Sequence, residues 1–251
     1  MEYLYKYGRI NDYSAALFSK SYVWFSAPSE LNDPFECRPW YTFEGNPEQI
    51  VASARKMLQT ESPDLTSNMT TAQAVALFLE GRHRDPEAQK RAREVAAHWL
   101  AKVGLYCLSR VRDNILMWSH YADQHRGYCL EFEATDHTYM FGDAHPVSYS
   151  DDYPSVEFYT VPSSEQVHLS FLSKYRGWSY EQEWRVIDTR NGFGLRSYPP
   201  ELLRGVIFGL RMPDSDKTRI REWMKQRGHS VKFYECRQDD RRFQIDIKQL
   251  E

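Results

Sequence analysis

The chain has 251 residues, of which 41% are apolar and 27% are charged, and these proportions are typical of a folded globular protein and exclude an intrinsically disordered one. Its formal net charge of −3 comes from 32 basic and 35 acidic residues, so no overall charge excess requires a nucleic acid or an anionic membrane as partner. The four cysteines form no C-x-x-C pair, which excludes zinc and redox motifs of that kind. No run approaches roughly 18 apolar residues, so no membrane span is expected. Together these features predict a cytoplasmic protein with reduced thiols.

The N-terminal part predicts two strands around a short helix. Residues Tyr3–Tyr7 alternate in character and form the first expected strand, and Tyr22–Phe25 form the second. Between them, Ala15–Phe18 belong to a short helix that follows a cap at Asn11–Tyr13.

A turn-rich loop and a helical region follow. In the loop Leu31–Glu36, Asn32 and Asp33 are expected to bond their own backbone, which makes a turn that ties down the start of the helical region. Residues 46–102 predict a helical insertion, because apolar residues recur there at helical spacing. Three such stripes occur, within Ile50–Leu58, Ala74–Leu79 and Ala92–Val103.

The middle of the chain predicts a compact unit of strand, helix and strand. The first strand is Leu105–Ser109 and the second is Gly127–Glu133. The helix between them, Ile115–Gln124, is expected to be capped by Asp113 or Asn114.

The stretch Lys174–Ile187 concentrates charged and aromatic side chains. Its second half, from Tyr180 onward, alternates in character and predicts a strand, on which Glu181, Glu183 and Arg185 share one face at spacings of about 6–7 Å. A carboxylate beside an arginine keeps a low pKa and stays ionised, which suits a group that binds a ribose hydroxyl or stabilises a developing cation. A solvated strand with surface ion pairs explains the same pattern equally well.

The remaining segments complete one α+β domain over residues 1–251, with a mixed or antiparallel sheet core and the helical insertion at 46–102. A short strand is expected at Val147–Tyr149 and a helix at Gln166–Tyr175. The last expected elements are a strand at Leu203–Gly209, a helix at Asp214–Arg227, and strands at Val231–Cys236 and Phe243–Ile247.

Common catalytic motifs are absent: the chain contains no G-x-S-x-G, no phosphate-binding P-loop, no G-x-G-x-x-G and no H-E-x-x-H. The helical segment Trp118–Tyr121 carries four side chains with polar heads, which at about 100° per residue cannot all face one pocket. A polar network that braces this helix against the sheet explains them as well as a binding site does. His120 and His125 fall on different sides of the helix, so no metal site is expected.

Several of these stretches together resemble a bacterial domain of unknown function, DUF2971. The resembling stretches are Leu4–Tyr7, Trp24–Ser29, Asn32–Phe35, Leu116–Asp123 with His125 and Gly127, Tyr180–Arg185, and Ile207–Gly209. The resemblance extends over essentially the whole chain, with residues 46–102 as a variable insertion. It implies a common fold and no particular activity, because the family has no established one.

The order of the parts is also similar to the ADP-ribosyltransferase fold. In that fold an early strand carries an Arg or His that contacts NAD, a middle strand carries a Ser or Tyr at the nicotinamide pocket, and a late strand carries a Glu, often as E-x-E. The resemblance places Arg9, Ser109 and Glu183 at these positions. It implies that Glu183 holds the nicotinamide-ribose hydroxyl and stabilises the oxocarbenium-like transition state, and that Glu181 orients the acceptor nucleophile.

The same resemblance implies further cofactor-binding residues. Trp118 or Tyr121 would stack on nicotinamide, and His120, Asn32 and Asp33 would belong to the same site. NAD would be the substrate, and no metal is expected.

The chain departs from the ADP-ribosyltransferase pattern at two of these positions. Arg9 is expected in a turn, where the pattern has a strand, and Ser109 is followed by Arg110, where the pattern continues with Thr-Ser. An E-x-E on a strand is a short motif, so this step is an analogy at the level of the fold.

Two functions of different classes follow. The first is an NAD-using enzyme that transfers ADP-ribose to a protein or nucleic acid or hydrolyses NAD. Toxins and phage-defence effectors often have such folds. This function predicts that Glu183→Ala abolishes nicotinamide release without unfolding the protein. The second is a non-enzymatic binding or regulatory module in which Asn32, Asp33, His120 and the glutamate strand are structural. A cavity that contains Glu183 and an aromatic ring would favour the enzyme. A flat solvated surface, or a buried pair of Glu183 with Arg185, would favour the module.

Overall fold

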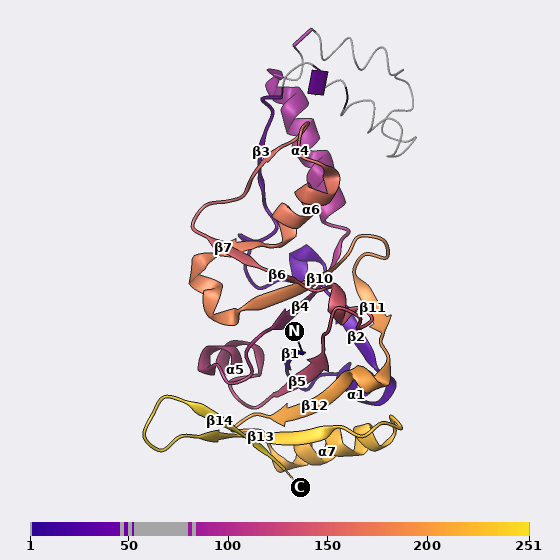
Figure 1. Ribbon diagram of the computed structural model, residues 1–251, viewed down its shortest axis with the longest axis vertical. Coiled ribbons are helices and arrows are strands. Elements are labelled where there is room, and N and C mark those ends of the chain that lie inside the picture. The colour runs from indigo at the N-terminus through magenta and orange to yellow at the C-terminus, as the bar shows by residue number, and fades with distance from the viewer. Residues whose placement is uncertain (1, 46–47, 50–51, 53–79, 82–83, 251) are drawn as a thin grey trace.

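The computed structural model describes residues 2–45, 48–49, 52, 80–81 and 84–250 (Figure 1). The strands are β1 Tyr3–Gly8, β2 Tyr22–Phe25, β3 Trp40–Thr42, β4 Gly104–Ser109, β5 Tyr128–Glu133, β6 His145–Pro146, β7 Ser148–Ser150, β8 Ser155–Glu157, β9 Ser173–Tyr175, β10 Glu183–Asp188, β11 Gly194–Ser197, β12 Leu203–Phe208, β13 Lys232–Gln238 and β14 Ile245–Gln249. The α-helices are α1 Ser14–Lys20, α4 Pro86–Leu100, α5 Ile115–Tyr121, α6 Ser163–Phe171 and α7 Asp214–Lys225, and the 3-10 helices are η1 Pro28–Glu30, η3 Phe141–Asp143, η4 Arg176–Glu181 and η5 Pro200–Leu202.

An eight-stranded sheet forms the centre of the molecule, in the order β14-β13-β12-β5-β1-β4-β10-β6. Its neighbouring strands are antiparallel except for β12 and β13, which run parallel. The expected mixed sheet and α+β class are therefore confirmed.

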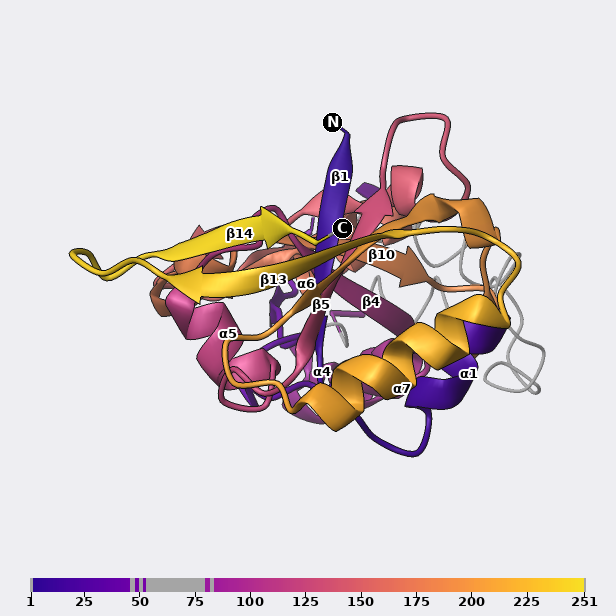
Figure 2. The same cartoon turned by 90° about the horizontal axis from the view of Figure 1, so that it is seen from below.

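Helices cover both faces of this sheet, and neighbouring residues of β5 show why. Side chains on a strand alternate between faces, so Leu130 joins the hydrophobic cluster that contains Phe18 of α1, whereas Cys129 joins the cluster that contains Met117 of α5. α7 packs beside α1 on the first face (Figure 2). The second face, under α5, is the one that matters for the candidate site.

The sheet is split between β1 and β4. These two strands share a single register pair, Tyr5 with Ser109, whereas the β1–β5 and β4–β10 pairings each contain six. Beyond that pair the two strands run apart (Figure 2). At its far end β4 pairs instead with Ser26, through two backbone hydrogen bonds of 2.8 and 2.9 Å between Ser26 and Leu105. Backbone groups that face the split lack a strand partner, so this is a place where other donors and acceptors can bind.

Most elements lie where the sequence predicts them, but two boundaries near the site do not. The predicted helix Ile115–Gln124 ends at Tyr121, and the three residues Asp123, Gln124 and His125 then have positive φ angles of 47°, 53° and 69°. The predicted strand from Tyr180 begins only at Glu183, because the preceding residues form η4 and Gln182 is left-handed at φ 42°. Neither left-handed turn contains a glycine that would signal it in the sequence.

Two further boundaries are shifted. The predicted helix Gln166–Tyr175 ends at Phe171, because Ser173–Tyr175 pair in parallel with β7 as strand β9. The last predicted strand is displaced toward the C-terminus, to Ile245–Gln249.

The predicted helical insertion is only partly described. α4 forms over the third apolar stripe, after an Asp85 side chain that accepts a hydrogen bond from the Glu87 backbone at 3.1 Å. The other two stripes lie outside the described residues. No described helix combines the length and the apolar composition that a membrane span requires.

Candidate functional site

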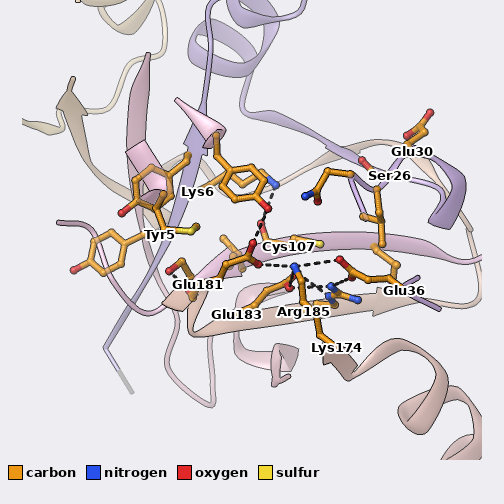
Figure 3. Close-up of a pocket in the computed structure, with 18 residues that line it drawn as sticks. Tyr5, Lys6, Ser26, Glu30, Glu36, Cys107, Lys174, Glu181, Glu183 and Arg185 are labelled. Atoms are coloured by element: carbon orange, nitrogen blue, oxygen red, sulfur yellow. Dashed lines mark hydrogen bonds and ion pairs between the residues drawn. The ribbon is translucent and has the colours of Figure 1, made fainter. Parts of the chain in front are cut away.

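A cavity of about 280 Å³ lies at the split in the sheet (Figure 3). β1, β4 and β10 each contribute a wall residue from one row across the sheet, because Tyr5 is paired with Ser109 and Ser109 with Glu183. The loop after β2 closes another side, with Ser26 and Asn32 among the lining residues. Segments that are far apart in the sequence therefore meet at this cavity.

Five charged residues form a buried cluster at the cavity: Glu36, Lys174, Glu181, Glu183 and Arg185 (Figure 3). The Lys174 ammonium lies 2.5 Å from Glu181 Oε2, 3.0 Å from Glu183 Oε2 and 3.1 Å from Glu36 Oε1. The ammonium donates hydrogen bonds to Glu181 and Glu183, whereas its contact with Glu36 is an ion pair without a hydrogen bond. Lys174 is the residue that joins the three acids.

Arg185 holds the cluster from the other side. Its Nε and Nη2 donate to the two oxygens of Glu183 at 2.7 and 2.8 Å, which is the planar, bidentate arrangement that fixes a carboxylate most firmly. Nη2 also donates to Glu36, and Nη1 donates to the Phe171 carbonyl at 2.9 Å. The guanidinium is fully buried, so these partners replace the water that it has lost.

A local bend in the chain brings the two glutamates together. On a regular strand Glu181 and Glu183 would be two residues apart and would share one face. In the structure Glu181 is the last residue of η4, and only Glu183 belongs to β10. The left-handed Gln182 between them turns the chain. The Ser109 hydroxyl stabilises this turn by donating to the Glu181 carbonyl at 2.5 Å. Both carboxylates consequently point at Lys174.

The cluster contains three carboxylates against two cations, so full ionisation would leave one net negative charge in a desolvated place. The pKa values of the two glutamates diverge accordingly. Burial raises the pKa of Glu181, and the attraction of Lys174 does not fully offset it. Burial also opposes ionisation of Glu183, but Arg185 and then Lys174 outweigh it and hold the pKa of that carboxyl well below its usual range. The pKa of Glu181 is thus raised where that of Glu183 is lowered.

This difference gives the two acids different chemical capacities. Glu183 is a permanent negative charge with fixed orientation, which can stabilise a positive charge that develops in the cavity. Glu181 is the member that can exchange a proton. Its Oε1 accepts a hydrogen bond of 2.6 Å from the Tyr121 hydroxyl, whose own pKa is raised by burial and by the charge of Glu181. Two neighbouring acids with pKa values pushed apart are typical of a catalytic site.

A second, larger cavity of about 760 Å³ adjoins the first. The two share four lining residues: Lys6, Tyr7, Glu30 and Tyr121. At the second cavity the exposed rings of Tyr13 and Trp24 stack with centroids 6.4 Å apart. The two cavities together form a groove that runs from an aromatic pair to the buried charges.

The residues proposed from sequence distribute over these cavities unequally. Glu181, Glu183, Ser109 and Asn32 line the first cavity, Arg9 and His120 line the second, and Tyr121 lines both. The hydroxyl of Ser109 is already engaged, since it also accepts the Val111 N–H at 3.1 Å. The Asp33 side chain lies away from both cavities and accepts a hydrogen bond of 2.7 Å from Trp178 Nε1.

Of the two aromatic candidates on α5, only Tyr121 reaches a cavity. Trp118 is 0% exposed, packs edge-on against Tyr7 at 5.2 Å and donates its Nε1–H to the Arg112 carbonyl at 2.8 Å. Both faces of its ring are occupied by the protein core, so the position suited to contact a ligand is that of Tyr121.

Sequence reasoning missed the two residues that complete the cluster, Lys174 and Glu36. Lys174 stands at the head of the charged stretch, but a lone lysine before an aromatic carries no signal of its own. Glu36 follows Asn32–Phe35, a turn in which sequence reasoning assigns Asn32 and Asp33 to the site but not Glu36. A charge count could have found Lys174, since two acids and one arginine in a desolvated place require a further cation, whereas that count gives no signal for Glu36.

Neither a cysteine nucleophile nor a metal centre is evident among the described residues. Burial and the nearby Glu183 raise the pKa of Cys107, at the first cavity, to about 12, which keeps the thiol protonated near neutral pH. No group of three His, Cys, Asp or Glu side chains within the described ranges is placed to hold a metal ion.

Comparison with known proteins gives one match. Residues 117–186 match the family model described as Protein of unknown function (DUF2971), and this segment contains α5 from Met117 onward, Lys174, Glu181, Glu183 and Arg185. No curated protein and no solved structure matches the chain. The expected resemblance is thus confirmed over the part of the chain that supplies most of the buried charge cluster. Residues 117–186 of this chain are therefore similar to DUF2971, a family of unknown function.

Proposed function

We propose that this protein is an NAD-using enzyme of the ADP-ribosyltransferase type, which transfers ADP-ribose to a macromolecule or hydrolyses NAD. The observation that carries the proposal is the row Tyr5, Ser109 and Glu183 across β1, β4 and β10, at a split in the sheet. The resemblance described above requires an early, a middle and a late strand to meet at one pocket. In the β1 position of this row the chain has Tyr5, while Lys6 and Arg9 supply positive charge along the adjoining groove.

The dimensions of the groove support a dinucleotide substrate. The first cavity alone, at about 280 Å³, is slightly smaller than typical ligand sites, and the adjoining cavity of about 760 Å³ extends it. The extension offers a stacked aromatic pair for a flat ring and two basic side chains for phosphate groups. An elongated ligand with a ring at one end and a reactive sugar at the other fits this order of features.

The two glutamates then divide the reaction. When the bond between nicotinamide and ribose breaks, its electron pair leaves with the neutral nicotinamide and positive charge develops on the ribose, where the ionised Glu183 stabilises it. The nucleophile, a hydroxyl or amine of the acceptor or a water molecule, forms the new bond and loses its proton to Glu181. A raised pKa brings Glu181 closer to the working pH, which is what an efficient general base requires. Lys174 and Arg185 act by holding both carboxylates in place.

A second candidate, a non-enzymatic binding or regulatory module, is favoured by one observation. Glu183 is 5% exposed, and both of its oxygens are bonded to Arg185 while one is also bonded to Lys174. A carboxylate so thoroughly paired can be purely structural. The cavity with Glu183 and Tyr121 favours the enzyme, and the buried pair with Arg185 favours the module, so experiment has to decide.

The deciding experiment measures nicotinamide release from NAD by the purified protein, with and without cell lysate, for wild type and Glu183→Gln. Glutamine is preferred to alanine because removal of a buried partner leaves charges uncompensated and costs about 3–5 kcal/mol of stability. Glu133→Gln is the matched control, since Glu133 forms an ion pair with Arg204 at the surface. We expect release that Glu183→Gln abolishes while the folded structure, checked by circular dichroism, is retained.

Dependence of that release on lysate would identify a macromolecular acceptor, and release in buffer alone would identify NAD hydrolysis. A toxin or phage-defence effector is the biological role that such an activity would serve. Absence of release in both conditions, together with no thermal shift by NAD, would reject the enzyme in favour of the binding module. Undiminished release by folded Glu183→Gln would reject the role of Glu183.

A further inference from the structure

A third cavity, of about 350 Å³, lies beside the charge cluster and is not used by the proposed reaction. Its walls come from Asp33 and Phe35, from residues 150–154 around β7, and from β9. It shares only Lys174 with the first cavity. The turn Asn32–Phe35, which the proposed reaction leaves largely unexplained, contributes two side chains here.

Three large aromatic side chains border this cavity although they are substantially exposed. Phe35 is 66% exposed, Tyr153 48% and Tyr175 57%. Single exposed aromatics are ordinary on protein surfaces, whereas several around one hollow mark a recognition site. Their ring faces carry partial negative charge, which attracts cations.

The buried carboxylate at this cavity belongs to Asp33, which is 8% exposed. It accepts the Phe35 N–H at 2.9 Å and the Trp178 Nε1–H at 2.7 Å, and both donors are neutral. Among the described residues no lysine, arginine or histidine forms an ion pair with it. A buried carboxylate that has neutral partners alone lacks the cationic partner that such groups usually have.

The remaining charges of the cavity leave its balance negative. Asp151 forms an exposed ion pair with Arg176 at 3.3 Å, and Asp152 is a further acid at the rim. Lys174 is the one cation among the lining residues, and its charge is met by the three glutamates on its other side. The cavity thus offers aromatic faces and carboxylates without a free cation among its lining residues.

We propose that this cavity binds a guanidinium group, such as the end of an arginine side chain. A guanidinium is planar and weakly hydrated, so it stacks on aromatic rings and also donates pairs of hydrogen bonds to a carboxylate. The rings of Phe35, Tyr153 and Tyr175 supply the first requirement, and Asp33 supplies the second. The site does not depend on NAD chemistry, so it stands or falls independently of the proposed enzyme.

The test is isothermal titration of the whole protein with Nα-acetyl-arginine amide, and with the citrulline and lysine analogues as matched probes. Citrulline keeps the shape and removes the charge. We expect the arginine compound to bind about tenfold or more tighter than citrulline, as charged hydrogen-bond partners do. Lysine, a compact cation without a planar face, should bind more weakly than arginine.

Two variants locate the binding. Asp33→Asn removes the charge and keeps the acceptor for the Phe35 N–H but not the one for the Trp178 Nε1–H, so its fold is checked by circular dichroism. Tyr153→Leu removes an exposed ring whose loss does not endanger the fold. Both should weaken arginine binding, whereas Tyr139→Leu, which removes an exposed ring that does not line the cavity, should not. The assignment would be overturned by equal affinity for the citrulline and arginine compounds, or by no detectable binding to the folded wild type. It would also be overturned if both variants bound the arginine compound as tightly as wild type.

Discussion

Arg185 and Glu36 are 149 positions apart in the sequence, yet they form a buried ion pair that ties the loop after β2 to the central sheet. The same guanidinium holds Glu183 in a bidentate arrangement. The loop, the sheet and the charged wall of the cavity are therefore a single electrostatic unit. Removing any one member leaves its partners charged and desolvated.

Glu36→Ala should lower the free energy of unfolding by about 3–5 kcal/mol, because Arg185 and Lys174 would each lose a partner in a place that water cannot reach. Glu36→Gln should lower it less, since one oxygen still accepts a hydrogen bond. Urea denaturation measures the free energy of unfolding of both variants, and the slope of that free energy with urea concentration should equal that of wild type. Glu133→Ala is the comparison, because its pair with Arg204 is exposed and is worth about 1 kcal/mol or less. Equal losses for Glu36→Ala and Glu133→Ala would contradict the buried cluster.

Acid and alkali should act on the two site glutamates in opposite directions. The pKa of Glu183 lies below its ordinary value of 4.5, so its stabilising contribution is complete above that pH and is lost as the pH falls. The pKa of Glu181 is raised above 4.5, so its contribution is complete at low pH and is lost as the pH rises through the raised value. Glu181→Gln should therefore gain stability relative to wild type as the pH rises from about 4. Glu183→Gln should lose stability relative to wild type as the pH rises toward 4.5 and should change no further above that pH. Free energies of unfolding of the two variants that follow the same pH trend relative to wild type would refute the divergence.

Local patterns in the sequence predicted the elements that depend on local causes. β4 and β5 are short apolar runs because both of their faces are buried, and β1 is a short run rich in tyrosine, so each is visible without knowledge of the neighbours. The cap at Asn114 was likewise predictable, since its side chain accepts the N–H groups of Leu116 and Met117.

The charge cluster depends on tertiary causes and was only half predictable. Glu181 and Glu183 were expected to share a strand face, and they do meet, but through the left-handed Gln182 between them. Nothing in a glutamine indicates a positive φ, which is held there by the Arg110 N–H donating to the Gln182 carbonyl at 3.0 Å. Glu36 could not be assigned for a similar reason, because its partner is in a strand on the far side of the insertion.

Tyr121→Phe tests the proton-exchanging role of Glu181. The hydrogen bond from the Tyr121 hydroxyl stabilises the ionised Glu181 carboxylate, so the loss of this bond should raise the pKa of Glu181 further. If nicotinamide release requires ionised Glu181, the midpoint of its pH dependence should move to higher pH, while the retained ring keeps the fold. Tyr180→Phe is the matched control, because its hydroxyl contacts His120 Nδ1 at 3.0 Å. A midpoint shared by wild type and both variants would show that Glu181 does not set the pH dependence.

Substitutions of Trp118 and Tyr121 should have opposite effects: the first should mainly lower stability, and the second should mainly weaken NAD binding. Trp118→Phe leaves space in a packed core and frees the Arg112 carbonyl, so it should lower the free energy of unfolding by about 1–3 kcal/mol. Its effect on NAD affinity should be small, because its ring does not reach a cavity. Tyr121→Leu should weaken NAD binding more than it lowers stability. Titration with NAD and urea denaturation separate the two effects, and the opposite ranking would place the ligand-contacting ring at Trp118.

The Lys6 side chain lies in the split between β1 and β4, where it bonds a backbone carbonyl of β4 that has no partner among the described strands on that side. Its Nζ donates to the Cys107 carbonyl at 2.8 Å and lies 4.9 Å from the centre of the Tyr106 ring, so the side chain spans from β1 to β4. Lys6→Met keeps the length and removes the charge, and it should lower the free energy of unfolding by about 1 kcal/mol through the lost hydrogen bond. Because Lys6 lines both cavities of the groove, the larger effect should be on NAD, whose affinity should fall about tenfold with the loss of a charged contact. Lys20→Met, at the exposed end of α1, is the control for a lost positive charge. If Lys6→Met and Lys20→Met bind NAD equally well, phosphate groups do not reach the split, and the groove has another ligand.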